Sequence, residues 1–391
     1  MCWKILLGGT LDMSNTENDS INLTDYLYSK AYVRRIPISG TFELSPLCNF
    51  SCRMCYVHKT AKEVSEHSRV MMDLDHWLEI AEKAKREGML YLLLTGGEPL
   101  LWPDFWTLYE KLSEMGLIID INTNGSLINA EAVERFTKHP PRRINITLYG
   151  GCDETYEALC GVRGMYDKVT KAVDMLTEKN IHVKINVSLT PYNKHDLEKI
   201  IRFAKDRNLL VHATTYMFPP VRRDETMIGM NERFSPEESA EYRLQIFRLL
   251  FGEEKFAKYL EDIRNDYTPP AGLDESCVDH LDGQVQCMAG RASFWITWDG
   301  WMTPCGMMIQ PKVDLMKNNF ALAWRKLTEM SSHLVLSGLC TNCKNQKNCH
   351  ACAAMAMAET GSSEKVPVYL CKEMKAKKEI ADRLLNERGI Y

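Results

Sequence analysis

The sequence lacks the long apolar run that a membrane-spanning helix needs. No stretch approaches the roughly 18–20 apolar residues that cross a bilayer, and the opening MCWKILLGG is too short and too weakly charged for a secretory signal. An excess of one charge is missing too, since 48 basic residues face 52 acidic ones and the formal net charge is -4. We therefore expect a cytoplasmic protein whose partners include neither nucleic acid nor a membrane.

Internal repeats and low-complexity tracts are also absent, whereas cysteine is abundant, with 14 in 391 residues. In a large chain without a secretory signal, so many thiols favour metal binding over disulfides. Most of them form two sets, one within residues 48–55 and one within residues 287–371. Cys2, Cys152 and Cys160 are scattered, and their default interpretation is a small buried hydrophobe.

Between about residues 39 and 217, short β-rich runs alternate with helical patterns, which is typical of βα units and a parallel sheet. The pattern predicts an α/β fold, a partial (β/α)6 TIM-like barrel with its chemistry at the carboxyl ends of the strands. Asp73 and Asn193 are expected helix caps. The expected strands are 41–44, 91–95, 118–122, 144–148, 183–189 and 211–216, and the expected helices are 73–88, 103–116, 129–138, 165–180 and 193–207.

After residue 217 the alternation ends. Two Pro-Pro pairs flank a helical pattern from Pro236 to about Asp266, and SFWITWDGWMTPC predicts a hairpin that turns at Trp298-Asp299-Gly300. A charged amphipathic helix is expected from about Lys372 onward. The expected parts are an N-terminal extension, a barrel, a helical bridge and a small cysteine-rich auxiliary domain, at 1–38, 39–217, 218–276 and 277–391.

The first cysteine set, Cys48-x3-Cys52-x2-Cys55, directly follows the first expected strand. Three thiolates on a 4Fe-4S cluster leave one iron open to an outside ligand. With the aromatic Tyr56 behind it, this spacing resembles the defining motif of the radical S-adenosylmethionine (SAM) superfamily. The resemblance implies that the open iron binds the amino and carboxylate groups of SAM and that Tyr56 packs near the adenine. A zinc knuckle or a redox motif is the alternative.

A second match follows the second expected strand, where Gly96-Gly97-Glu98-Pro99 resembles the GGEP motif of the same family. Glycines let the backbone approach a ligand, and the carboxylate of Glu98 can take the SAM ammonium group. The family also has polar SAM contacts at later strand ends, although each can equally be a satisfied strand-end side chain. The matching residues here are Asn122, Thr123, Asn124, Thr147 and Asn186.

The family often has an arginine shortly after strand four for the SAM carboxylate. This chain has Cys160 near that place and Arg163 slightly later. Arg163 is therefore the candidate for this contact, and the partner of the carboxylate stays open.

The second cysteine set resembles the seven-cysteine SPASM domain over roughly residues 277–375. One spacing departs from the family, because two residues separate Cys349 from Cys352 where three are commoner. The resemblance implies two auxiliary 4Fe-4S clusters, with Cys277 either completing the first or leaving it open. The implied ligands are Cys287, Cys305 and Cys352 for the first cluster, and Cys340, Cys343, Cys349 and Cys371 for the second. Zinc is the alternative for residues 340–352.

The resemblance implies an oxygen-sensitive enzyme with three 4Fe-4S clusters. It would reductively cleave SAM to a 5′-deoxyadenosyl radical that abstracts a hydrogen atom, and a flavodoxin or ferredoxin would supply the electron. Most SPASM-bearing relatives modify peptides. We therefore expect maturation of a ribosomally made peptide, through a thioether or carbon–carbon crosslink or a related oxidation.

Three alternatives remain. One is radical dehydrogenation or rearrangement of a small molecule such as a sugar or a tetrapyrrole. Another is formylglycine formation in a sulfatase, against which Gly306 stands where those relatives tend to carry an aspartate. The third, an electron-transfer or iron–sulfur scaffold protein, does not explain the GGEP match. About 38 residues precede strand one, too few for a leader-binding domain, so a peptide would need a separate leader-binding protein or the bridge.

Overall fold

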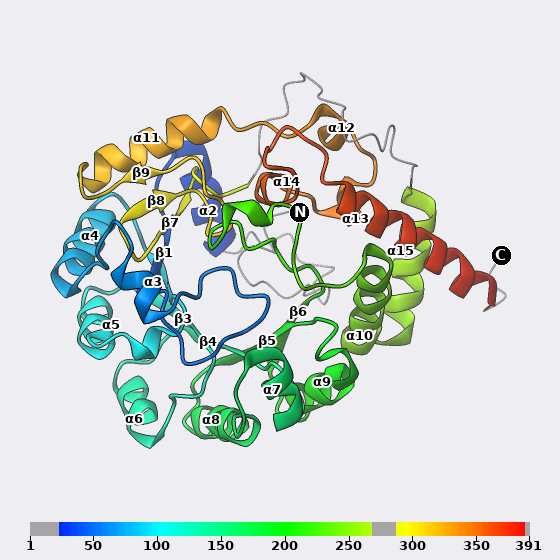
Figure 1. Cartoon of the computed structure of the whole chain (residues 1–391), viewed down its shortest axis with the longest axis horizontal. Helices are drawn as coiled ribbons and strands as arrows, with labels where there is room; N and C mark the ends of the chain where they lie inside the picture. Colours follow the sequence, from blue (N-terminus) through cyan, green and yellow to red (C-terminus); the bar gives the residue numbers. More distant parts are fainter. Residues whose placement is uncertain (1–22, 268–286, 388–391) are drawn as a thin grey trace.

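A nine-stranded sheet organises the part of the chain that the computed structural model describes, residues 23–267 and 287–387 (Figure 1). Its strand order is β6-β5-β4-β3-β2-β1-β7-β8-β9. Neighbours from β6 to β7 are parallel, whereas β7, β8 and β9 form an antiparallel meander. The strands are β1 Ser39–Glu43, β2 Tyr91–Thr95, β3 Ile118–Thr123, β4 Arg143–Thr147, β5 Val183–Ser188, β6 Leu210–Thr214, β7 Ser293–Ile296, β8 Trp301–Thr303 and β9 Val313–Asp314.

Helices follow the parallel strands and form an outer layer around them (Figure 1). Their apolar faces pack against the outward side chains of the strands in one core that includes Trp77, Ile121, Phe136 and Ile185. The expected partial α/β barrel is therefore confirmed. The outer helices are α4 Leu74–Arg86, α5 Phe105–Glu114, α6 Ala130–Lys138, α7 Asp153–Cys160, α8 Tyr166–Glu178 and α9 Leu197–Asp206.

The other face of strands β3 to β6 lines the lumen of the barrel. Side chains alternate along a strand, and paired residues of parallel strands point to the same face. The register joins Asp120 to Arg143, Asn145 to Lys184, and Asn186 to His212. Because the isoleucines between them face the helices, these polar side chains share the lumen.

The six expected strands are confirmed, with ends that shift by one or two residues. Asp73 caps α4 as expected, accepting a hydrogen bond of 3.0 Å from the backbone N–H of His76. The expected cap Asn193 stands at the N-cap position of the 3-10 turn before α9 but makes no capping hydrogen bond with its side chain. Its side-chain oxygen accepts from the backbone N–H of Thr190 at 2.7 Å, and its amide nitrogen donates to the carbonyl of Tyr149 at 2.8 Å. Asn193 therefore ties together the loops after β4 and β5.

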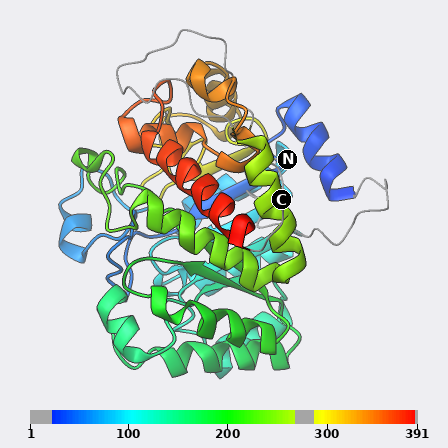
Figure 2. The ribbon, with the colours of Figure 1, turned by 90° about the vertical axis from the view of Figure 1, so that its right-hand side faces the viewer.

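The expected hairpin is present as β7 and β8, and β7 also pairs with β1. The bridge contains α10, Pro236–Asp266, which is kinked at Gly252 and packs side by side with α15, Val368–Glu387 (Figure 2). The other elements are α2 Leu23–Arg34, α3 Ala61–Ser65, α11 Phe320–Ser332, α12 Gly338–Thr341, α13 Gln346–Cys349 and α14 Ala353–Thr360, with 3-10 turns η1 Pro99–Leu101, η2 Lys194–Asp196 and η3 Glu225–Met227.

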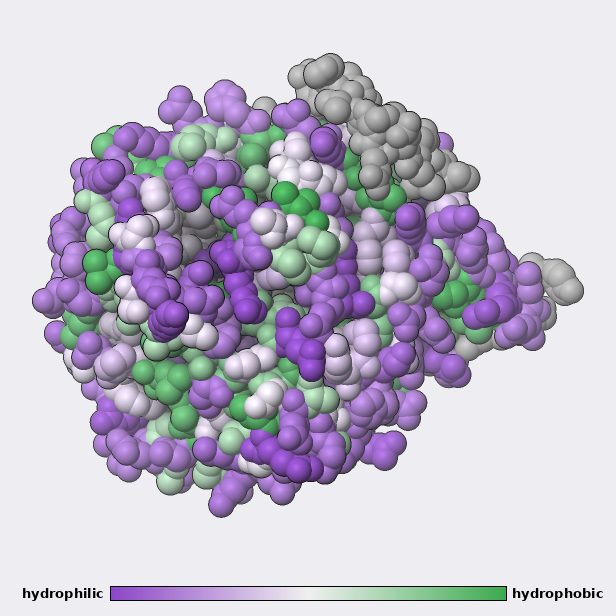
Figure 3. Space-filling model, in the orientation of Figure 1, coloured by the Kyte–Doolittle hydropathy of each residue, from purple (hydrophilic) through white to green (hydrophobic). Residues whose placement is uncertain are grey.

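The surface is mixed in character. Hydrophilic residues cover most of the face seen in Figure 3, and hydrophobic residues lie among them in small groups. Within residues 23–267 and 287–387, no helix has both the length and the apolar content to span a bilayer.

Candidate active site

The loop that carries the first three cysteines directly follows β1 and is anchored to the end of α7. The backbone N–H groups of Ser51 and Arg53 donate to the carbonyls of Cys160 and Leu159, at 2.9 and 3.0 Å. The Nε of Arg53 adds a bond of 2.8 Å to the carbonyl of Ala158. The last carbonyls of a helix lack partners within it, so here the cysteine loop satisfies them and is held in place.

The donors around the three sulfurs fit cluster ligands. The backbone N–H groups of Phe50 and His58 point at the Sγ atoms of Cys48 and Cys55, at 3.4 and 3.3 Å. Burial raises the pKa of the Cys48 thiol to about 12, so its thiolate needs a nearby cation such as iron. The hydrogen bond with Cys160 lowers the pKa of Cys52, which places the Cys160 thiol beside the expected ligands.

The two glycines of the GGEP segment let it pack against the residues just before Cys48. A Cβ on Gly97 would lie 2.3 Å from the carbonyl oxygen of Leu47, and one on Gly96 would lie 2.5 Å from that of Ser45. The backbone N–H of Gly97 donates to the Ser45 carbonyl at 2.7 Å, and that of Glu98 donates to the Leu47 carbonyl at 3.0 Å. The loops after β1 and β2 therefore form one unit.

The Glu98 carboxylate is fully buried beneath this unit. It accepts hydrogen bonds from the Thr123 hydroxyl at 2.8 Å and from the backbone N–H groups of Asn124 at 2.8 Å and Leu100 at 3.1 Å. Burial raises its pKa to about 7. Glu98 thus joins the ends of β2 and β3, and its pairing with a SAM ammonium stays a prediction.

The other expected SAM contacts lie at different distances from the carboxyl ends of the strands. The Asn124 amide donates to Asn49 at 2.9 Å and steadies the cysteine loop. Asn122 accepts a bond of 2.8 Å from Asn145 inside the lumen. Thr147 pairs in register with Asn186, whose buried Oδ1 has no partner within the described residues.

Arg163 is not brought to the site. Its side chain is 62% exposed and pairs with Glu154 at 3.4 Å and Glu157 at 3.5 Å on the surface of α7. The C-terminal turn of α7, which the sequence pattern did not predict, directs the chain outward at Gly161, where φ is 67°. The prediction that Arg163 contacts the SAM carboxylate therefore has no support in the geometry.

A buried ion pair that the sequence did not reveal joins the barrel to the cysteine-rich segment. Arg222 makes two hydrogen bonds of 2.7 Å to the Glu43 carboxylate and one of 2.9 Å to the Gly306 carbonyl. The Trp295 indole N–H also donates to Glu43, at 2.9 Å. The Arg222 guanidinium lies 5.8 Å from the ring centre of Tyr56, so this network connects Tyr56 with the backbone next to Cys305.

The cysteines after residue 286 fall into two groups in space. Cys352 interacts electrostatically with Cys305 and Cys287. Cys371 interacts with Cys340, Cys343 and Cys349. Burial raises the pKa of Cys340, Cys352 and Cys371 to about 12 each, so these thiolates also need positive charge nearby. Thiols are the donor type that iron–sulfur clusters take, but within residues 23–267 and 287–387 no group of three or more such side chains is arranged to hold a metal ion.

The short spacing between Cys349 and Cys352 is accommodated by a turn. Cys349 ends α13, His350 adopts a left-handed conformation with φ of 57°, and Cys352 is the N-cap of α14. The turn separates the two cysteines, one into each group. Cys277, the expected eighth thiolate, lies outside the described residues.

Comparison with known proteins agrees with this geometry. Residues 42–204 match a family model described as the Radical SAM superfamily. The AdoMet-dependent heme synthase of Methanosarcina barkeri is 24% identical over 82% of this chain and 92% of its own. Mycofactocin maturase MftC of Mycobacterium ulcerans is 25% identical over 83% of this chain and 85% of its own.

A solved structure is similar over nearly the whole chain. The structure of Streptococcus suis SuiB bound to the precursor peptide SuiA has a TM-score of 0.62 and 19% identity, and the match covers 94% of this chain and 87% of that one. At this identity the likeness shows the fold.

Fold and site together define an α/β-barrel enzyme with three cysteines in the loop after its first strand. Residues 42–204 of this chain form a radical SAM domain. Its family implies one 4Fe-4S cluster and SAM, which when bound supply the one-electron cleavage that starts the reaction. Cys48, Cys52 and Cys55 are the residues that would hold that cluster.

Proposed function

We propose that this enzyme uses SAM-derived radical chemistry to oxidise a peptide substrate and matures a ribosomally made peptide through a thioether or carbon–carbon crosslink. The 5′-deoxyadenosyl radical would take a hydrogen atom from the peptide. Cys287, Cys305 and Cys352, and Cys340, Cys343, Cys349 and Cys371, would hold two auxiliary clusters able to take up electrons. A flavodoxin or ferredoxin would be the donor, and a separate protein would present the leader.

The observation that carries this proposal is the open edge of the barrel. Strand β6 is the last strand of the sheet, and Leu210 and His212 are exposed along it. An extended peptide can add to such an edge through backbone hydrogen bonds, with alternate side chains entering the lumen. The likeness to maturase MftC and to the peptide-bound fold of SuiB supports the same class of substrate.

The test is co-expression with the short peptides encoded beside the gene, followed by mass spectrometry. We expect one peptide to lose two hydrogen atoms for each crosslink. The Cys48→Ala, Cys52→Ala, Cys55→Ala variant should lose about four iron per chain, all SAM cleavage and the product. The Cys340→Ala, Cys343→Ala variant should keep SAM cleavage without product, and barrel stability and iron content separate this loss from unfolding.

A small-molecule substrate is the second candidate, favoured by the match to a heme synthase over 92% of that protein. If no neighbouring peptide changes mass while added tetrapyrrole acids are consumed with 5′-deoxyadenosine formation, this candidate replaces the first.

A further inference from the structure

The lumen contains a buried lysine whose role the proposed radical chemistry does not explain. Lys184 of β5 is 5% exposed. It makes no hydrogen bond or ion pair with any residue in the described part of the chain. Burial first, and Arg143 second, lower its pKa to about 8, so it still carries its proton at neutral pH. A mostly buried lysine whose ammonium has no protein partner is costly to a folded protein.

Polar atoms around Lys184 lack partners too. Arg143 Nε, Asn145 Oδ1 and Asn186 Oδ1 are buried and have no hydrogen-bond partner among the described residues. Asn145 is 4% exposed and pairs in register with Lys184. Buried polar groups in folded proteins are almost always satisfied. Donors and acceptors without partners on one face of β4 and β5 therefore form a surface that can bind a polar ligand.

The charges near Lys184 add up to an excess of positive charge. Asp120 is a carboxylate whose charge acts on Lys184, and it already pairs with Arg142 and, at 3.5 Å, with Arg143. On the helix side, Glu373 pairs with Arg243 at 3.4 Å and Lys377 at 3.2 Å. The cations whose charges reach Lys184 or its neighbour His212 are Arg142, Arg143 and Arg243. An anion is the ligand that this field favours.

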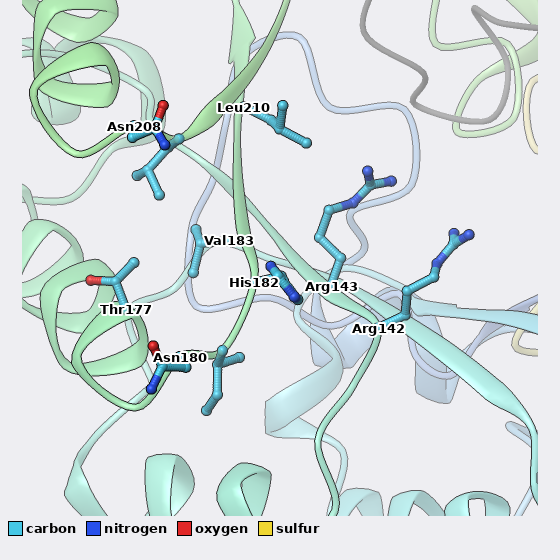
Figure 4. Close-up of a pocket in the computed structure, with 10 residues that line it drawn as sticks. Arg142, Arg143, Thr177, Asn180, His182, Val183, Asn208 and Leu210 are labelled. Carbon is cyan, nitrogen blue, oxygen red and sulfur yellow. The ribbon is translucent and has the colours of Figure 1, made fainter.

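Two members of the group lie near openings of the barrel, Arg143 beside a cavity at the floor and His212 on the edge strand β6. A cavity of about 430 Å³ at the floor is lined by Arg142, Arg143 and Leu210, among others (Figure 4). In Figure 4, Arg143 and Leu210 extend to one side of β5, whereas Val183 lies on the other. His212 of β6 is exposed and lies in the next residue layer toward the carboxyl ends of the strands, where it pairs in register with Asn186. Desolvation and then the neighbouring cations lower its pKa to about 4, so it is a neutral N–H donor.

We propose that Arg143, Asn145, Lys184, Asn186 and His212 form a subsite for a carboxylate that lies beside an amide N–H, as in an acidic residue of a peptide. Lys184, Arg143 Nε and His212 donate to the carboxylate, and the open Oδ1 atoms of Asn145 and Asn186 accept the amide N–H. The inference rests on the proposed function, because it assigns this ligand to the substrate.

The test is anaerobic calorimetry on the reconstituted full-length enzyme with SAM present. N-acetylglutamate α-amide should bind, and N-acetylglutamine α-amide, which lacks the charge, should bind at least ten-fold more weakly. Lys184→Met should remove this ten-fold preference. Lys171→Met is the matched control, since Lys171 is exposed on α8, and it should leave both affinities unchanged.

Thermal unfolding separates a ligand site from a structural role. A lysine kept for a ligand costs stability when the ligand is absent, so Lys184→Met should raise the unfolding temperature of the free enzyme. Its SAM dissociation constant should stay within two-fold of the parent. Equal binding of the two probes, unchanged glutamate-probe affinity in Lys184→Met, or a ten-fold loss of SAM affinity in that variant would each overturn the subsite. Because these are binding readouts, they stand apart from whether a peptide product forms.

Discussion

Gly97 packs directly against the carbonyl of Leu47, one residue before Cys48, and a Cβ at Gly97 would lie 2.3 Å from that oxygen. A side chain at position 97 could not push this atom aside, because the Leu47 oxygen belongs to the backbone. The position of Cys48 therefore depends on the absence of a methyl group at Gly97, 49 residues later in the chain. This dependence explains physically why a glycine pair accompanies the cysteine motif.

Gly97→Ala should consequently lose about four iron per chain and all SAM cleavage while retaining iron at the auxiliary cysteines. Iron analysis and electron paramagnetic resonance of the reconstituted protein measure this. The control is Gly116→Ala, where a Cβ meets no atom within 4 Å and only the backbone strain of a φ of +77° is added. Full iron content in Gly97→Ala would show that the loop can move without releasing the cluster.

Residues whose role follows from spacing along the chain could be predicted, and residues whose role follows from a distant partner could not. Cys48, Cys52 and Cys55 stand out in sequence because only a few residues separate them, and Glu98 stands out because it lies in the GGEP segment. Glu43 and Arg222 are 179 positions apart. The sequence around one of them gives no indication that the other is its partner. Lys184 resembles any strand lysine until its burial is known.

At the scale of elements, the regular βα units were predictable because each strand and helix carries its own periodic pattern. Helix α7 was missed because its eight residues follow a glycine pair and carry only weak periodicity. Its end nevertheless anchors the cysteine loop and turns Arg163 away from the site. Errors in the predicted site therefore came from a short element whose position is decided by tertiary contacts.

The packing of α10 against α15 depends on a buried charge group. Glu373 is 2% exposed and lies between Arg243 and Lys377. Glu373→Gln would leave the buried Lys377 and the partly buried Arg243 without their carboxylate, so we expect a loss of about 3 kcal/mol in the free energy of unfolding. Denaturant unfolding measures the loss, and Lys375→Met, on an exposed part of the same helix, should change stability by less than about 0.5 kcal/mol. Equal stability of both variants would contradict this account.

At the scale of the whole molecule, strand β1 is shared by the barrel and the cysteine-rich segment. It pairs with β2 on one side and with β7 on the other, over residues 39–42. Phe294 of β7 packs within the same core as Phe42. The boundary that composition places at residue 277 therefore crosses a continuous sheet.

A chain ending at residue 276 should be insoluble, because it exposes the edge of β1 and an apolar surface that β7 normally covers. Sedimentation of the expressed protein tests this. A second truncation, after residue 319, keeps β7 to β9 and should remain in the soluble fraction to a greater extent. Equal solubility of the two truncations would show that the edge of β1 needs no partner.

The shared strand also limits how such an enzyme can be recombined. A chimera that joins this barrel to the auxiliary segment of another family member at residue 277 must rebuild the β1–β7 ladder and the contact of Gly306 with Arg222. Exchange of substrate preference between relatives should therefore succeed when strands β7 to β9 come from the same parent as the barrel and the crossover falls in α11. It should fail when the crossover falls in the bridge.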